Sequence, residues 1–236
     1  MNVNEMFGVR RGKHDDPWSS VSDLMSGLMI IFMFVAIAYM TSVQQGKKKI
    51  ENIVILWDKT QEAIYRDLYN EFKDDLPKWR ASLNKETLSI RFEEPSVYFE
   101  TGSDILKDEF KKILKEFFPR YLNRLRKHRE NIAEVRIEGH TSSEWVDAKN
   151  ELDAYFRNME LSQSRTRSVL QYCLTLPAVS YDIPWMRDTI TANGLSSSKP
   201  ILTSDGREDK SQSRRVEFRV RTDAEKRIVT ILEEIR

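Results

Sequence analysis

The 236-residue chain has one cysteine, eight glycines and no excess of charge of either sign. The single cysteine, Cys173, excludes an internal disulfide but does not choose between cell compartments. The formal net charge is +1 although 32% of the residues are charged, so the charge balance indicates neither a nucleic-acid-binding protein nor an acidic tail. The mean hydropathy is negative, as in a soluble protein, which limits any membrane part to a short segment.

Several catalytic signatures are absent as well. The sequence contains no P-loop, no Gly-x-Ser-x-Gly turn, no Cys/His zinc pattern and no His-Glu-x-x-His helix. His140 has no second His or Cys at ligand spacing, which favours packing at the end of a strand over metal binding. We therefore expect a protein that is not an enzyme and that holds no metal or organic cofactor.

One long apolar run is present, between Leu24 and Gln45, where 22 residues carry no charge. At about 1.5 Å per residue this run can cross a hydrocarbon core of about 30 Å. It is longer than the apolar part of a signal peptide, and no small-x-small cleavage site precedes a polar domain. Residues 19–45 are therefore predicted to form a retained transmembrane helix behind an N-terminal tail, residues 1–18.

The charges around this run do not orient it in the membrane. Arg10, Arg11 and Lys13 precede the run and three lysines at 47–49 follow it, so the positive-inside rule gives a tie. Behind these lysines, apolar residues at helical spacing predict an amphipathic helix from about 48 to 75. This helix could be a stalk, a short coiled coil or the first helix of the next domain, and we assign residues 46–80 to a juxtamembrane helix or linker.

Asp23 stands at the start of the apolar run. A carboxylate at the membrane centre costs about 2.5–3.5 kcal/mol on insertion scales, and intramembrane acids usually serve ion pathways or polar pairing. Alternatively, Asp23 lies at headgroup depth and caps the helix together with the preceding serines. Ser26 and Gly27 follow at i+3 and i+4 on the same helical face, where small residues let another helix approach closely. This pattern favours an ion-handling role for Asp23 on a face that meets a partner helix.

Residues 81–236 are predicted to form one folded domain of alternating strands and helices. Strand patterns occupy 87–92, 96–99, 132–140, 189–195 and 214–221, and helix patterns run from 102 to 117 and from 159 to 174. Val216, Phe218 and Val220 are expected to point inward. The order predicts an α+β fold, a βαβαβ-type sandwich of about 140 residues behind one transmembrane helix. The basic run at 124–130 is expected to be a solvated helix end rather than a contact for an anionic polymer.

Five motifs occur in the order known from one family. They are VYFETGSDIL (97–106), VRIEGHTSS (135–143), NMELSQSRTRSVLQY (158–172), ITANGLSSSKPI (190–201) and RRVEFRV (214–220). They resemble the successive signatures of the OmpA-like peptidoglycan-binding domain. A single span bearing an aspartate in front of such a domain resembles the MotB-type stator subunits of ion-driven motors. The short chain and the segment SDLMSGLMIIFMF resemble ZorB-type, MotB-like subunits of Zorya anti-phage defence systems more than flagellar MotB.

This resemblance implies a function and partners. The equivalent aspartate of stator units carries the ion, so Asp23 would be protonated and released beside a ring of multi-span MotA-like or ZorA-like subunits. The ion is expected to be a proton by family analogy, with sodium as the alternative. The resemblance also implies a homodimer in the bacterial inner membrane, with a cytoplasmic N-terminus and a periplasmic domain. A flagellar stator subunit and a passive cell-wall tether, in which Asp23 is only a cap, are the alternative functions.

The resemblance further implies a binding site for the diaminopimelate-containing stem peptide of peptidoglycan. In the family, an arginine in a Leu-Ser-x-x-Arg motif holds a ligand carboxylate, and the matching residue is Arg165. A salt bridge on the helix surface is the alternative role for Arg165. Asn158, Thr141, Ser142 and Arg214 match other binding positions.

One position departs from the family pattern. The family usually has an aspartate where this chain has Ser142, so the acid that pairs with the ligand amine is missing. Glu144 is a neighbouring candidate for that role. The segment 143–157 is expected to border the pocket and to change its specificity.

Overall fold

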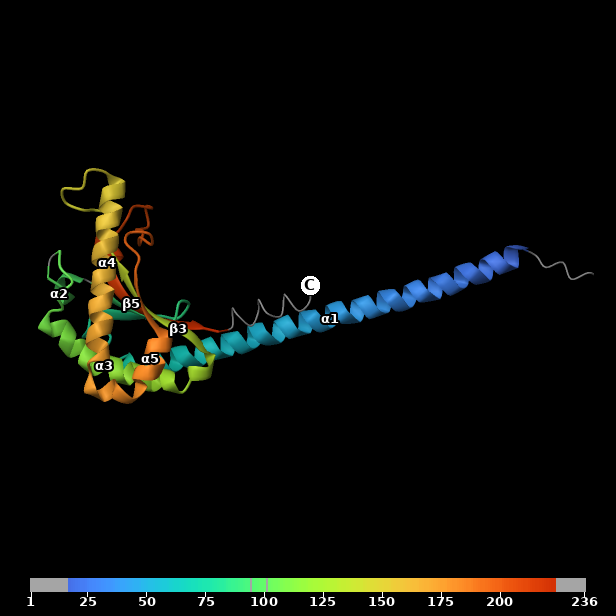
Figure 1. The fold of residues 1–236 in the computed structure, drawn as a ribbon, viewed down its shortest axis with the longest axis horizontal. Helices are drawn as coiled ribbons and strands as arrows, with labels where there is room; N and C mark the ends of the chain where they lie inside the picture. The colour runs from blue at the N-terminus through green and yellow to red at the C-terminus, as the bar shows by residue number, and fades with distance from the viewer. Residues whose placement is uncertain (1–16, 94, 101, 224–236) are drawn as a thin grey trace, which may run out of the picture. The chain divides into compact units, whose positions relative to one another are not determined.

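The computed structural model describes residues 17–93, 95–100 and 102–223 (Figure 1). Within these ranges the chain divides into two compact units, an N-terminal unit that ends at Glu51 and a C-terminal unit that begins at Asn52. The predicted tail, residues 1–18, lies outside the described residues except for Pro17 and Trp18.

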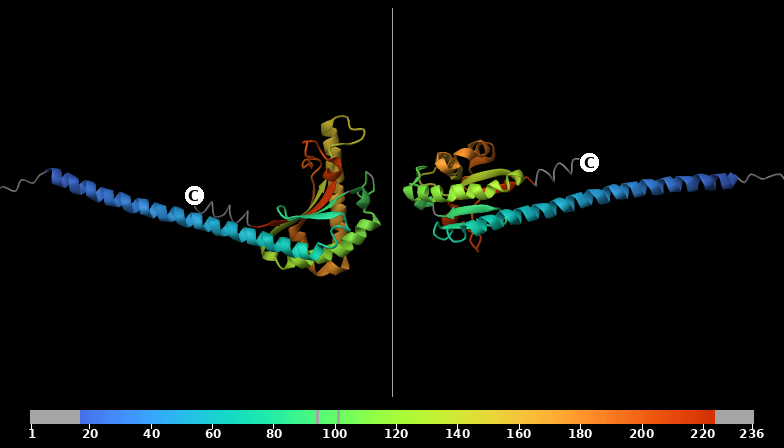
Figure 2. Two further views of the ribbon diagram at one scale, coloured as in Figure 1. Left: turned by 180° about the vertical axis from the view of Figure 1, so that it is seen from behind. Right: turned by 90° about the horizontal axis from the view of Figure 1, so that it is seen from below.

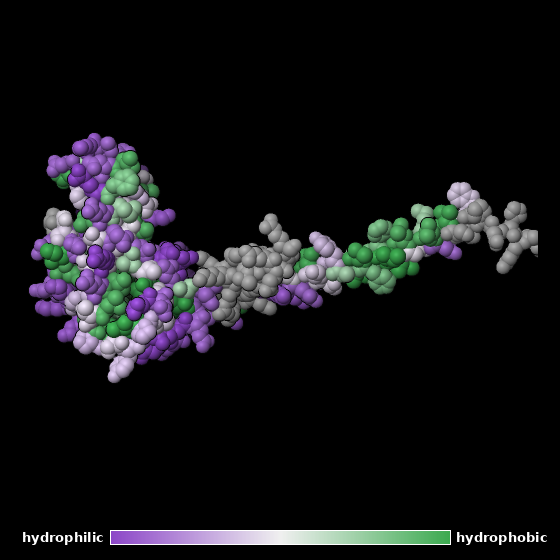
Figure 3. Space-filling model, viewed as in Figure 1, coloured by the Kyte–Doolittle hydropathy of each residue, from purple (hydrophilic) through white to green (hydrophobic). Residues whose placement is uncertain are grey.

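The N-terminal unit consists of the first part of a single helix, α1, which runs from Pro17 to Phe72 (Figures 1 and 2). Its portion Val21–Glu51 is long and apolar enough to cross a membrane, and Figure 3 shows these apolar residues as a green band. The amphipathic helix expected from 48 to 75 is the continuation of this same helix, and it ends at Phe72.

The last turns of α1 belong to the core of the C-terminal unit. Ile64, Leu68 and Phe72 recur at i+4 on one helical face and are completely buried. This burial decides between the alternatives for the amphipathic segment, since its end is the first helix of the folded domain. Complete burial of a Leu, Ile or Phe side chain stabilises a fold by about 1.5–3 kcal/mol.

The C-terminal unit is built on a five-stranded sheet in the order β1-β2-β5-β3-β4. Its strands are β1 (Ala81–Asn84), β2 (Ser89–Glu93), β3 (Ile132–His140), β4 (Ile190–Gly194) and β5 (Arg215–Thr222). Strands β3 and β4 pair in parallel, and the other neighbouring pairs are antiparallel. The predicted strands at 87–92, 132–140, 189–195 and 214–221 are thus confirmed, whereas β1 was not predicted.

Two long helices pack on one face of the sheet (Figure 2). These helices are α3 (Asp108–Arg126) and α4 (Glu151–Leu174); shorter elements are α2 (Pro95–Tyr98), η1 (Arg129–Asn131), η2 (Pro177–Asp182), α5 (Ile183–Thr189) and α6 (Lys210–Ser213). Val216, Phe218 and Val220 of β5 are buried as predicted, and the ring of Phe218 lies 5.1 Å from that of Phe117 on α3. The α+β class expected from the sequence is confirmed.

Three local predictions are wrong. Residues 96–99 do not form a strand, because α2 covers Pro95–Tyr98 and only Phe99 makes an isolated bridge, to Leu106. This bridge holds residues 103–107 out of helical geometry, so α3 begins at Asp108 instead of 102 and the side chain of Ile105 is 58% exposed. Helix α4 starts at Glu151, eight residues before the predicted start, where the Asn150 side chain accepts a hydrogen bond from the backbone N–H of Asp153.

The basic run at 124–130 is also not a solvated helix end. Three of its side chains form ion pairs, Arg124 with Glu71 and both Arg126 and Arg129 with Asp182. A fourth, His128, shares a hydrogen bond with Asp67. The Asp182 carboxylate is buried, and it accepts hydrogen bonds at 2.5 Å from Arg126 and at 2.7 Å from Arg129. The run therefore fixes α3 against the end of α1 and against η2.

Candidate functional site

Asp23 lies in the apolar part of α1, six residues after the first residue of the helix. Only the first four N–H groups of a helix lack an internal partner, so Asp23 lies beyond a capping position and the cap alternative loses its geometric basis. The carboxylate-bearing residue is exposed in the single chain, like the apolar side chains around it.

Ser26 and Gly27, which are predicted to share the helical face of Asp23, carry a small side chain or none. We call this the smooth face. The Ser26 hydroxyl donates to the backbone oxygen of Ser22 at 2.8 Å, so its hydrogen-bonding capacity is used within the helix. A Cβ atom at Gly27 would meet nothing within 4 Å. A second helix could therefore approach the backbone closely beside Asp23.

The five residues predicted to bind peptidoglycan lie together in one groove of the C-terminal unit, with a volume of about 480 Å³. These residues are Thr141, Ser142, Asn158, Arg165 and Arg214. The groove is completed by Glu100, Gly102, Glu144, Trp145, Val146 and Leu161. The sequence therefore located the groove, and the segment 143–157 borders it as expected.

The sheet register brings these residues together. Thr141 and Ser142 directly follow β3, and Arg214 directly precedes β5. The two strand ends are neighbours because His140 pairs with Arg215 in the antiparallel β3–β5 ladder. Helix α4 adds Asn158, Leu161 and Arg165, whose spacing of three and four residues places them on one helical face.

Two glycines allow α4 to lie directly on the sheet. Gly139 and Gly194 are register partners on β3 and β4. A Cβ atom at Gly194 would lie 2.4 Å from the backbone nitrogen of Gln163, and one at Gly139 would lie 2.8 Å from the carbonyl oxygen of Ser162. The Gly194 N–H also donates to the Gln163 side chain at 2.7 Å. Helix α4, whose one face lines the groove, can thus take its position only because Gly139 and Gly194 have no side chains.

Arg165 is held in place without being neutralised. Its Nε donates to the carbonyl oxygen of Ser103 at 2.9 Å, and its guanidinium carbon lies 4.9 Å from the centroid of the Phe99 ring. Burial lowers the pKa of Arg165 to about 10, an effect that Asp104 opposes and Arg214 reinforces. The guanidinium is therefore still charged at neutral pH. Since its described hydrogen bonds go to carbonyl oxygens, the surface salt bridge is not the role that the geometry supports.

The groove contains a buried hydroxyl, that of Thr141, without a hydrogen-bond partner among the described residues. Thr141 is 4% exposed, and its Oγ1 has no hydrogen bond within the described ranges. Ser142 is also buried. The Asn158 side chain donates from Nδ2 to the carbonyl oxygen of Glu144 at 3.1 Å. Buried polar atoms are nearly always satisfied, whereas the Thr141 oxygen is a polar atom directly under the groove surface whose partner is not among the described residues.

Contacts that the sequence did not reveal hold the outer wall of the groove. The Ser143 N–H and hydroxyl donate to Glu208 at 3.1 and 2.5 Å, and Lys210 forms an ion pair with Glu144. Glu144, the candidate replacement for the missing acid, thus lines the groove but already has a cationic partner. Trp145 and Val146 were visible in the sequence only as part of an inserted segment, whereas nothing in the sequence links Lys210 to Glu144.

A buried charged cluster lies behind the end of β3. Donor atoms of Glu138, His140 and Glu217 come within 4.8 Å of one another. Burial lowers the pKa of His140, although Glu138 opposes this effect. Glu217 already accepts hydrogen bonds from Arg215 at 2.6 Å and from Arg91 at 3.0 Å. These guanidiniums balance Glu217, and Arg219 lies 3.9 Å from Glu138, so the carboxylates of the cluster have cationic partners within the protein. The packing role of His140 stays a prediction.

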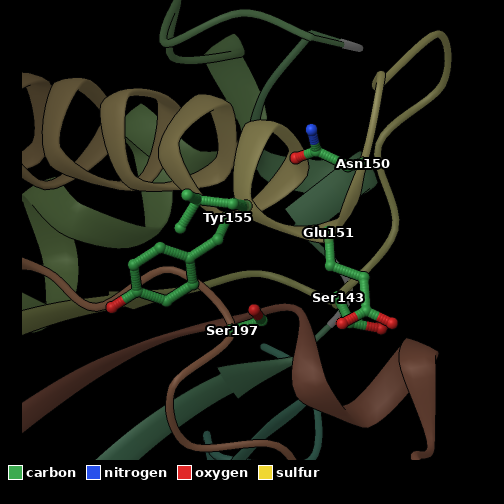
Figure 4. Close-up of a pocket in the computed structure, with 6 residues that line it drawn as sticks. Ser143, Asn150, Glu151, Tyr155 and Ser197 are labelled. Carbon is green, nitrogen blue, oxygen red and sulfur yellow. The ribbon is translucent and has the colours of Figure 1, made fainter.

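A second cavity, of about 950 Å³, opens beside the first turns of α4 (Figure 4). It is lined by Ser143, Asn150, Glu151, Leu152, Tyr155 and Ser197. Figure 4 shows the Tyr155 hydroxyl pointing away from the Glu151 carboxylate, so the polar groups do not converge. None of the lining residues is basic, and we assign no ligand to this cavity.

The chain is similar to proteins of known classes. Residues 98–214 match the OmpA family. The chain is 46% identical over 235 residues to the Zorya protein ZorB of Escherichia coli strain Crooks, covering 98% of this chain and all of that protein. A putative MotB-like protein from Desulfovibrio vulgaris shares the fold, with a TM-score of 0.50, 21% identity, and coverage of 70% of this chain and 96% of that one. The cell wall anchor of the Pseudomonas aeruginosa T6SS follows with a TM-score of 0.45, 23% identity, and coverage of 66% and 96%.

Proposed function

The chain belongs to the ZorB family of Zorya proteins, and from this premise we propose that it is a peptidoglycan-anchored stator subunit of a proton-driven inner-membrane motor in anti-phage defence. The observation that carries the proposal is the pairing of two features in one chain. An aspartate lies in the apolar part of α1, and the C-terminal unit has a groove with a positioned guanidinium.

The groove would anchor the subunit by binding the stem peptide of peptidoglycan. Arg165 presents a planar fork of donors to a carboxylate, which suits recognition by two parallel hydrogen bonds. Arg214 adds a second positive charge on the same groove. The Thr141 hydroxyl is left to accept or donate a further hydrogen bond, and Trp145 supplies an apolar wall.

Asp23 would carry the proton. A carboxylate can take up and release a proton at each cycle, whereas an amide of the same shape cannot. The smooth face formed by Ser26 and Gly27 would contact a ring of multi-span MotA-like subunits. Two copies of this chain would supply two Asp23 carboxylates that are used alternately, and proton passage would rotate the surrounding ring. The N-terminus would be cytoplasmic, and the C-terminal unit would hold the axis still in the periplasm.

The ion-carrying role is tested by phage plaquing on cells that express the chain with its native neighbouring genes. We expect Asp23→Asn to abolish protection at matched expression, because the amide cannot exchange a proton. Asp58→Asn, at an exposed position farther along α1, is the matched control and should protect like the wild type. Full protection by Asp23→Asn would instead identify a passive tether.

The anchoring role is tested by retention of the full-length protein on purified peptidoglycan. Arg165→Ala removes charge-assisted hydrogen bonds worth about 1.5–3 kcal/mol. The affinity for peptidoglycan should therefore fall by about 10- to 150-fold, which is measured as lower retention. Arg167→Ala removes an exposed arginine from the same helix and should be retained normally. Equal retention of both variants would exclude the groove as the anchor.

A further inference from the structure

We propose that the groove selects a peptide carboxylate whose neighbouring amine is acylated, as in a cross-link between two stem peptides, and does not favour a free ammonium group. The inference rests on the proposed anchoring function and specifies the ligand of that same groove. Its basis is the distribution of charge among the lining residues.

Two arginines give the groove a concentrated positive charge. Arg165 and Arg214 both line it. The described hydrogen bonds of Arg165 end on carbonyl oxygens, and the single carboxylate of Asp104 that acts on Arg165 faces two guanidiniums. Two guanidiniums attract a carboxylate and repel an ammonium group. A ligand therefore binds with its carboxylate toward these arginines.

Beside Arg214 the groove offers hydroxyls instead of a free acid. Thr141 and Ser142 directly follow β3, next to the start of β5, and both are buried and uncharged. An ammonium group placed beside them would lose water without gaining a counter-charge, which is unfavourable. An amide N–H has no charge to desolvate, so an acylated amine meets a smaller cost beside these residues.

The two acids of the groove do not change this balance. Glu144 is ion-paired with Lys210, so its negative charge is already compensated. Glu100 lies at the Arg165 end, since its carbonyl oxygen accepts a hydrogen bond from the Arg165 guanidinium. Trp145, Val146 and Leu161 also line the groove, and their apolar surface suits the acyl group of a cross-link better than a hydrated ammonium.

The test measures binding of two synthetic peptides to the full chain in lipid nanodiscs by titration calorimetry. The peptides end in diaminopimelate and differ only in the side-chain amine, which is free in one and acetylated in the other. We expect the wild type to bind the acetylated peptide more tightly than the free-amine peptide. Ser142→Asp should shift the ratio of affinities by about tenfold toward the free amine, which corresponds to about 1.4 kcal/mol.

A second variant is needed because Ser142 is buried and Ser142→Asp could disturb the fold. Lys210→Met acts at a half-exposed side chain and releases Glu144 from its ion pair. The released acid should shift the ratio by about threefold toward the free-amine peptide, the size of a surface ion pair. Lys199→Met, at an exposed lysine outside the groove lining, should leave the ratio unchanged.

The outcomes separate this inference from the anchoring function. A wild type that binds the free-amine peptide as tightly as the acetylated peptide, or more tightly, overturns the inference, as does retention on peptidoglycan without binding of either peptide. Failure to bind the peptides together with failure to be retained on peptidoglycan overturns the anchoring function itself. Equal shifts for Lys210→Met and Lys199→Met would refute the role of the Glu144–Lys210 pair.

Discussion

Replacing Gly194 by alanine should destabilise the C-terminal unit, because the added methyl group has no room. Its carbon would lie 2.4 Å from the backbone nitrogen and 2.6 Å from the Cα atom of Gln163. Both are backbone atoms, so no side-chain rotation relieves the contact. Overpacking of this kind costs about 1–3 kcal/mol. Movement of α4 would also weaken the hydrogen bond from the Gly194 N–H to Gln163, worth about 0.5–1.5 kcal/mol.

One effect acts in the opposite direction. Alanine reduces the conformational entropy of the unfolded chain and so stabilises a protein by about 0.4–1 kcal/mol where the native backbone accepts it. The net loss for Gly194→Ala is then about 0.5–4 kcal/mol, with a central value of about 2 kcal/mol. For a unit of this size the central value lowers the melting temperature by about 4–8 °C. Near-ultraviolet circular dichroism of the full chain in detergent measures this change through the packing of the aromatic core.

Gly206→Ala is the matched control for this prediction. Gly206 has a φ of +80° but open space around it, so alanine there adds only backbone strain of about 1–2 kcal/mol. Gly194→Ala should therefore melt at the lower temperature, and it should also weaken peptidoglycan retention, because α4 carries Arg165. Equal melting of Gly194→Ala and the wild type would refute the account of how α4 is seated on the sheet.

Three further predictions concern the interior of the C-terminal unit. Arg120→Ala should lower its unfolding free energy by about 2–3 kcal/mol in urea, because Glu71 and Asp75 lose charged partners at 2.7 and 2.9 Å; an unchanged urea midpoint would contradict this. Burial alone would raise the pKa of Glu71, but Arg120 and Arg124 together lower it below the ordinary 4.5. The contribution of Glu71 to the free energy of unfolding should therefore be constant above pH 4.5 and be lost on further acidification. In a plot of unfolding free energy against pH, Glu71→Gln should reduce the slope below pH 4.5. Burial raises the pKa of the Cys173 thiol, so Cys173 should resist Ellman's reagent until the unit unfolds, and rapid labelling of the native protein would refute its burial.

The sheet could be predicted from the sequence because alternation along the strands is strong. In 132–140 and 214–221, apolar and charged residues alternate, and the apolar set of β5 meets the helices. The short strand β1 has the sequence ASLN, which lacks β-branched and aromatic residues. It pairs with β2 through a close antiparallel connection. This strand owes its conformation to pairing rather than to propensity.

The error at 96–106 has a different cause. SVYF has the composition of a strand, but Tyr98 and Phe99 are buried against Phe110 in a cluster of rings 4.5 and 5.7 Å apart. Burial of these aromatic rings fixes the segment as a short helix followed by a bridge. Tertiary packing thus overrides local propensity, as short apolar segments often allow.

The residues of the groove could be predicted from local motifs, but one of its ion pairs could not. Its predicted residues lie in motifs whose positions relative to β3, α4 and β5 follow from the chain order. The ion pair of Glu144 with Lys210 joins a loop to the start of α6, far away in the sequence, and no periodicity relates the two residues. The charge of the groove therefore depends on this distant contact as well as on Ser142.

The contact between α1 and α3 could have been recognised from charge spacing. Acids stand at 67, 71 and 75, and basic residues stand at 120, 124 and 128, in both cases four residues apart. Two such stripes face each other when their helices pack antiparallel, so that His128 meets Asp67 and Arg120 meets Asp75. The basic run on its own resembles a solvated helix end, and only the matching acidic stripe distinguishes it. Because the acidic stripe flanks the buried Ile64, Leu68 and Phe72, apolar burial and charge pairing both assign the end of α1 to the C-terminal unit.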